Sequence, residues 1–291
     1  MQVSKKLFLN GCSFVHGDDL LWPYSKLPTY DKTNIEYLSI LKQYNISGLI
    51  EKTEIFENIE NIARYGATND LITFSTIEFF NKIPQEDRSN YVACIGWTDP
   101  CRIMVPNDWA NPEDDFSKDD NIENLRKMWF HLNLYTMNGN DTDVQQKYKS
   151  LADEYVRQFT DSYWFKEHIK NILILENYFK ANNINFVFWN SIGFPLRSVD
   201  TYTKEIFLNF VDWSRWINWN DLKVQYMVKG TKIPPGFSHP YDQKFGVFCS
   251  MLEVIGEKQA WTNTKHPGPE AVSIWTKIIL KHLVAKNIIN G

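Results

Sequence analysis

The chain has 291 residues, of which 43% are hydrophobic, 15% aromatic and 23% charged. It can therefore bury a large core, and it is not a disordered tail. Its 31 Lys and Arg residues stand against 35 Asp and Glu residues, for a net charge of -4, and the basic residues form no dense run. This balance argues against a surface for nucleic acid or for anionic membranes.

The cysteines and the N-terminus narrow the range of expected cofactors and cellular locations. The four cysteines show no CxxC spacing, so neither a disulfide framework nor a zinc site is predicted, and we expect no metal and no other cofactor. No apolar stretch reaches the ~18 residues of a membrane span, and residues 1–9 lack the apolar segment of a signal peptide. These features lead us to expect a cytoplasmic protein.

Apolar stretches alternate with helical patterns along the chain. Strands are predicted at residues 6–10, 91–95 and 184–189, and a further apolar stretch covers residues 55–63. Apolar residues spaced by three and four predict helices over residues 35–42, 71–80, 165–181 and 270–286. Thr68 or Asn69 could cap the second of these helices. Strands that alternate with helices imply a parallel sheet with right-handed crossovers, and so an α/β fold in one domain.

Two stretches exceed a minimal five-stranded sandwich and are expected to be insertions over one rim. The first covers residues 106–161 and the second, which is rich in tryptophan, covers residues 198–261. Trp213, Trp216 and Trp219 recur every third residue, which on a helix would give a partial stripe. We favour packing of this stripe over a sugar-stacking platform or a protein interface.

Candidate functional residues follow the predicted strands where each strand ends. Ser13 follows the first strand, Gly66 follows the apolar stretch 55–63, and Thr98 follows the strand at 91–95, while His266 comes just before the last helix. In an open parallel sheet, ligands gather at the carboxyl ends of the strands. We therefore expect these residues to converge there.

These residue types suit acyl transfer. A serine hydroxyl is a weak nucleophile at neutral pH and needs an imidazole to take its proton, which Ser13 and His266 could provide together. The oxyanion that follows attack needs donors, and the N–H groups of Ser13 and Gly66 and the Thr98 hydroxyl could supply them. One donor of this kind is typically worth about 10²–10³ in rate.

The order and spacing of these motifs resemble the SGNH, or GDSL-type, hydrolase family over nearly the whole chain. The resemblance implies a three-layer α/β/α sandwich around a parallel sheet, the flavodoxin-like SGNH fold, with the two insertions added. It places Ser13 as the nucleophile, Gly66 as a backbone oxyanion donor, Thr98 in the third block and His266 as the base.

The sequence departs from the family pattern at three positions. Cys12 stands where the family usually has Asp, Thr98 stands where it has Asn, and Asn263 replaces the acid that supports the base. In a serine protease an acid-to-amide change of this kind costs about 10⁴ in turnover. A backbone carbonyl, or a carboxylate such as Asp99 or Asp242, could substitute, and a Ser-His dyad is the other alternative.

Further candidates lie beside these motifs. Arg102 could pair with Asp99 or with an anionic group of a substrate, or it could form a surface ion pair. His16 is expected to line the cleft. We interpret Cys12 as a small packing residue and not as a nucleophile.

Two functions follow from the resemblance. The leading one is a serine esterase similar to family members that remove acyl groups from carbohydrates, whose ligand is a small-molecule or carbohydrate ester. The alternative is a structural or binding protein that keeps the fold without catalysis, because the Gly-Cys-Ser-Phe and Gly-Trp-Thr motifs resemble SGNH-like proteins of tailed phages. Its aromatic insertions would then dock protein partners, in a virion or in the cytoplasm of an infected cell.

Overall fold

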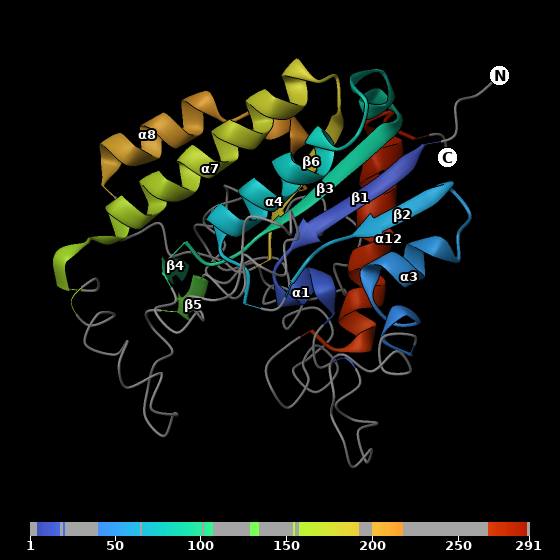
Figure 1. Cartoon of the computed structure of the whole chain (residues 1–291), viewed down its shortest axis with the longest axis horizontal. Helices are drawn as coiled ribbons and strands as arrows, with labels where there is room; N and C mark the ends of the chain where they lie inside the picture. Colours follow the sequence, from blue (N-terminus) through green and yellow to red (C-terminus); the bar gives the residue numbers. More distant parts are fainter. Residues whose placement is uncertain are drawn as a thin grey trace, which may run out of the picture.

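A four-stranded parallel sheet forms the centre of the protein (Figure 1). In the computed structural model the described residues are 5–17, 20, 40–64, 66–100, 102–106, 129–133, 154, 157–191, 200–217 and 267–289. The strands are β1 (Lys6–Gly11), β2 (Asn58–Asn61), β3 (Tyr91–Trp97) and β6 (Asn185–Asn190), in the order β2-β1-β3-β6. The fold is therefore α/β with a parallel sheet, as the alternating pattern predicts, and the predicted strands are confirmed.

Helices alternate with these strands. They are α1 (Ser13–His16), α3 (Ile46–Glu51), α4 (Asn69–Asn81), α7 (Asp161–Ala181), α8 (Thr201–Phe210) and α12 (Pro269–Ala285), with 3-10 helices η2 (Gln85–Asn90) and η4 (Trp213–Arg215). A separate antiparallel ribbon pairs β4 (Arg102–Pro106) with β5 (Trp129–Asn133).

Aromatic contacts hold α4 and α7 against one face of the sheet. Phe8 of β1 packs on Phe79 and Phe80 of α4, with ring centroids 4.5 and 4.9 Å apart. On the same face Phe186 of β6 packs on Phe179 of α7 at 5.2 Å. Offset and tilted ring pairs of this kind add to the free energy gained from burying the rings.

The opposite face of the sheet carries α12. Trp189 of β6 packs edge-on against Trp275 of α12, with centroids 5.7 Å apart, and both indoles are fully buried. Helices α3 and α12 contact each other (Figure 1). Because both faces are covered, every residue of β3 is buried, which explains why this strand is a continuous apolar run and not an alternating one.

Several helix boundaries follow from capping. The Thr68 side chain accepts a hydrogen bond from the Leu71 N–H and begins α4, so of the two predicted caps Thr68 is the cap and Asn69 is the first helical residue. Thr160 caps α7 in the same way, which starts that helix four residues before the predicted position. Pro269 stands in the first turn of α12, where its missing N–H is tolerated.

The structure adds one short helix, α3, that the sequence pattern does not predict. Helix α3 was not predicted, because it is short and contains Gly48, at which a Cβ would meet the Lys42 carbonyl oxygen at 1.3 Å. Of the predicted helix 35–42, only residues 40–42 are described, and they are helical. Trp213 lies in η4 and Trp216 forms a parallel bridge with Phe188, so the two do not share an α-helix. The favoured packing interpretation is confirmed for both, because Trp216 is a core residue and its ring lies 5.3 Å from that of Trp213, which packs against the core. The insertion at 198–261 contains α8, and Trp219 lies outside the described residues.

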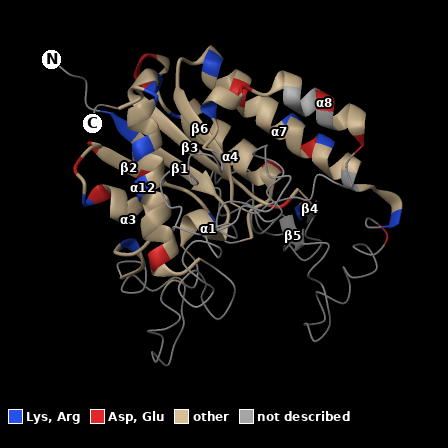
Figure 2. Cartoon of the chain, turned by 180° about the vertical axis from the view of Figure 1, so that it is seen from behind, with Lys and Arg blue, Asp and Glu red and all other residues tan. Residues whose placement is uncertain are grey.

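Charged residues of both signs are spread over the outer helices, while the central strands carry few of them (Figure 2). Among the described helices, including the 21-residue α7, none is both long and apolar enough to cross a membrane.

Candidate functional site

The direction in which the chain adds strands to the sheet reverses between β1 and β3. From β1 the chain crosses to β2 on one side, and from β3 it crosses to β6 on the other. The crevice beyond the carboxyl ends of two such strands is where open α/β sheets bind ligands. Gly11 and Gly96 pair in register at this point, and Ser13 and Thr98 each lie two residues further along.

Two glycines allow α1 to sit directly on the sheet. A Cβ on Gly11 would lie 2.4 Å from Val15 Cγ2, and a Cβ on Gly96 would lie 2.5 Å from the same atom. Gly11 also has a φ of 159°. Side chains at either position would push away α1, whose first residue is Ser13 and whose N-cap is Cys12.

Asn10, near the end of β1, forms hydrogen bonds with α4. Its Nδ2 lies 3.1 Å from the Ile72 carbonyl oxygen, 2.9 Å from Ser75 Oγ and 2.8 Å from Thr76 Oγ1, and its Oδ1 accepts the Gly11 N–H at 2.8 Å. This amide is buried, so the loss of its partners would be costly. It fixes the segment that leads into Ser13, which is itself only 2% exposed.

Gly66 lies in the loop between β2 and α4. Its φ of +68° is in the left-handed region, and a Cβ built there meets nothing within 4 Å. The glycine is therefore required by its backbone conformation and not by lack of space. Within the described residues, no backbone acceptor takes the Gly66 N–H, and the role of this group as an oxyanion donor stays a prediction.

Thr98 lies just beyond β3 with its main chain held by Asn69. The Thr98 N–H donates to Asn69 Oδ1 at 3.0 Å, and the Thr98 carbonyl accepts from Asn69 Nδ2 at 3.2 Å. The Thr98 side chain is 1% exposed, yet its Oγ1 makes no hydrogen bond within the described part of the chain. A buried hydroxyl without a partner carries a desolvation cost, and such groups call for an explanation.

His168 of α7 extends this cluster. Its Nδ1 lies 3.1 Å from Asn69 Nδ2, and its ring meets Trp97 edge-on with centroids 5.6 Å apart. Burial lowers the pKa of His168 to about 3, although a hydrogen bond with the Asn190 side chain opposes the shift. The imidazole is therefore neutral at physiological pH.

Arg102 begins β4, close to Thr98 in sequence. Its backbone N–H donates to the Asp99 carbonyl oxygen at 3.1 Å, which places the two residues side by side, and the expected pairing of their side chains stays a prediction. The Arg102 side chain is half-buried, and its Nε is buried without an acceptor among the described residues. This guanidinium could therefore receive an anion from outside the protein.

The remaining expected residues divide into described and undescribed ones. His16 ends α1 half-buried, and its carbonyl oxygen accepts from Asn45 Nδ2 at 3.2 Å. Cys12 is fully buried, as expected of a packing residue. His266 and Asn263 lie outside the described residues, so their distances to Ser13 stay predictions. Among the described residues no cluster of His, Cys, Asp and Glu could hold a metal ion.

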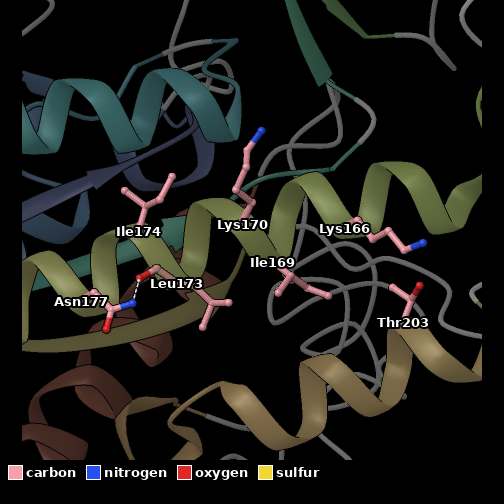
Figure 3. Close-up of a pocket in the computed structure, with 7 residues that line it drawn as sticks. All are labelled: Lys166, Ile169, Lys170, Leu173, Ile174, Asn177 and Thr203. Carbon is pink, nitrogen blue, oxygen red and sulfur yellow. Dashed lines mark hydrogen bonds between the residues drawn. The ribbon is translucent and has the colours of Figure 1, made fainter.

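A groove of about 510 Å³ lies between α7 and α8, away from these loops (Figure 3). Its lining residues are Lys166, Ile169, Lys170, Leu173, Ile174, Asn177 and Thr203. All of them belong to the two helices and none to a loop after a strand. The Thr203 hydroxyl donates to Asp200 Oδ2 at 2.7 Å, and the Thr203 N–H donates to Oδ1 of the same carboxylate, which caps the start of α8, so this pair has a structural role.

The sequence analysis missed Asn69 and His168 as site residues. The sequence pattern marks Asn69 only as a candidate helix cap, whereas its side chain binds the Thr98 loop. No pattern in the sequence singles out His168.

No protein-family model matches the chain, and a search of curated proteins also finds no match.

Proposed function

We propose that this protein is a serine ester hydrolase of SGNH type, with Ser13 as the nucleophile. The proposal rests on the position of Ser13 and Thr98, each two residues beyond the paired Gly11 and Gly96, and on the buried Thr98 hydroxyl, which has no partner among the described residues. A hydroxyl that no other described residue engages is available to an oxyanion. Such preorganised donors are the strongest single contribution to many acyl transfers.

The proposed roles follow the chemistry of acyl transfer. Ser13 Oγ attacks the ester carbonyl while His266 takes its proton, and the oxyanion binds the N–H groups of Ser13 and Gly66 and the Thr98 hydroxyl. His266 then returns the proton to the leaving alcohol. Water, activated by the same imidazole, releases the acid from the acyl-enzyme.

The finer architecture and the substrate class belong to the same proposal. The resemblance to SGNH hydrolases supports a three-layer sandwich and an acylated carbohydrate as substrate. The half-buried Arg102, whose Nε has no acceptor among the described residues, supports a substrate with an anionic group near the scissile ester.

Initial rates of p-nitrophenyl acetate hydrolysis test the proposal. Ser13→Ala is expected to lower kcat at least about 10³-fold, because removal of the nucleophile leaves only the oxyanion donors and binding. Ser47→Ala is the matched control, since Ser47 is also buried but lies in α3, where it bonds Asn45. Equal rates for wild type and Ser13→Ala would overturn the assignment.

Absence of hydrolysis by the wild-type protein would favour the second function, a scaffold that keeps the fold. The replacement of the family's acid by Asn263 favours that alternative, since an imidazole without a charged partner is a weaker base.

A further inference from the structure

A buried polar cluster converges on the loop that carries Thr98. Asn69 at the start of α4 is 4% exposed, His168 of α7 is 2% exposed and Thr98 is 1% exposed. Buried polar groups need partners, and each such group that is left unpaired is destabilising. Helix α4 already has its cap in Thr68, so capping does not explain Asn69.

Every polar atom of the Asn69 side chain is used. The Thr98 N–H can only donate, so the atom that faces it at 3.0 Å must be Oδ1 and the other atom must be Nδ2. One Nδ2 hydrogen reaches the Thr98 carbonyl oxygen at 3.2 Å, and the second reaches His168 Nδ1 at 3.1 Å. The amide therefore has a single possible orientation.

This orientation fixes the state of His168. Because Nδ2 is a donor, Nδ1 of His168 must accept, so the imidazole is neutral and carries its proton on Nε2. The ring also meets Trp97 edge-on and forms a hydrogen bond with the Asn190 side chain. His168 thus orients Asn69, and Asn69 holds both peptide groups of Thr98.

We propose that Asn69 and His168 form a positioning pair that fixes the Thr98 main chain, so that the Thr98 hydroxyl, which has no partner among the described residues, serves the oxyanion. This inference rests on the proposed hydrolase function. It assigns no contact with substrate to either residue. Small displacements of a group that stabilises a transition state lower the reaction rate steeply. A shift of about 1 Å can lower that rate about 10²-fold.

Steady-state kinetics on a p-nitrophenyl ester separates positioning from simple stability. His168→Leu removes the acceptor for Asn69 and is expected to lower kcat about 10- to 100-fold with KM unchanged. His168→Gln can place its Oε1 where Nδ1 stood, and it should recover kcat to within about threefold of wild type.

Asn171→Leu is the matched control on the same helix. Asn171 is also buried and also joins α7 to α4, through Asp70 at 2.9 Å, and its other hydrogen bond runs to the Glu167 carbonyl oxygen of its own helix. This variant should lose stability while kcat stays as in wild type. An equal fall of kcat in Asn171→Leu and His168→Leu would mean that general loosening is responsible, and it would overturn the inference.

A double-mutant cycle with Thr98→Val closes the test. If His168 acts through the Thr98 hydroxyl, His168→Leu should change kcat less than about twofold when that hydroxyl is already absent. A full 10- to 100-fold effect in the Thr98→Val background would overturn the inference but leave the hydrolase function intact. Lack of turnover by the wild type would instead reject the proposed function, and the inference with it.

Discussion

Val15 of α1 lies against Gly96 of β3 so closely that a Cβ on the glycine would come within 2.5 Å of Val15 Cγ2. This contact seats the helix that begins with Ser13 on the strand that leads to Thr98. The same absent Cβ would also meet Ser191 Oγ at 2.6 Å and Trp189 Nε1 at 2.8 Å. The relative positions of the two candidate catalytic loops thus depend on a residue without a side chain.

Gly96→Ala is therefore expected to destabilise the protein by about 1–3 kcal/mol, the range for overpacking in a filled core. Chemical denaturation monitored by tryptophan fluorescence measures this loss. Adding Val15→Ala should recover part of it, because the added methyl group then has room on one side. A double variant as unstable as the sum of the two single variants would contradict the contact.

Replacing Thr98 should separate stability from activity. Thr98→Val keeps the shape but removes a buried hydroxyl that has no partner among the described residues, so the free energy of unfolding should stay the same or rise. The same change should lower kcat about 10²-fold, as expected for one oxyanion donor. Thr98→Ser retains the hydroxyl and should keep most of the activity. A Thr98→Val protein that is less stable and equally active would contradict the role assigned here.

The buried neutral His168 predicts a pH dependence of stability. The folded-state pKa is about 3 against an ordinary value of 6.5, so between these values the unfolded chain binds more protons, and stability falls as the pH decreases. Between pH 7 and pH 5 the loss due to this group should be about 2 kcal/mol.

The comparison with His168→Gln isolates this effect, because glutamine does not titrate and all other groups are shared. The free energy of unfolding should depend on pH less steeply in the variant than in wild type over this range. Parallel curves for the two proteins would show that His168 is not buried in its neutral form.

Arg102 predicts a preference for anionic substrates. Arg102→Met should raise KM about 10-fold or more for a p-nitrophenyl ester that carries a carboxylate, since a charge-assisted hydrogen bond is worth about 1.5–3 kcal/mol. The KM for a neutral ester should stay the same. Arg102→Lys should lie in between, because lysine keeps the charge but not the planar donor geometry. Equal changes for both esters would argue against an anion site.

The parts of the fold that sequence predicts are those set by local patterns. Residues 91–95 are a continuous apolar run because both faces of β3 are buried, and Thr68 caps α4 through a side chain three residues from its partner. Local patterns do not predict α3, which contains Gly48. A side chain at this position would collide with the Lys42 carbonyl oxygen, and the glycine that this contact requires weakens the helical signal in the sequence.

The candidate site depends on longer distances along the chain. Ser13 and Thr98 could be proposed because each follows a predicted strand in a parallel sheet. His168 could not, because its role comes from Asn69, which is 99 residues away, and that residue in turn binds Thr98, 29 residues further along. Contacts of this kind leave no periodicity in the sequence.

The most direct test of the central claim is covalent labelling of the purified protein with a fluorophosphonate probe, followed by mass spectrometry of its peptides. An activated serine hydroxyl displaces fluoride from the probe, whereas an ordinary serine reacts very slowly. We expect one label on Ser13 in wild type and none in Ser13→Ala, with Ser47→Ala labelled as in wild type. A wild-type protein that stays unlabelled under conditions that label a control serine hydrolase, or that is labelled elsewhere, would contradict the assignment of Ser13 as the nucleophile.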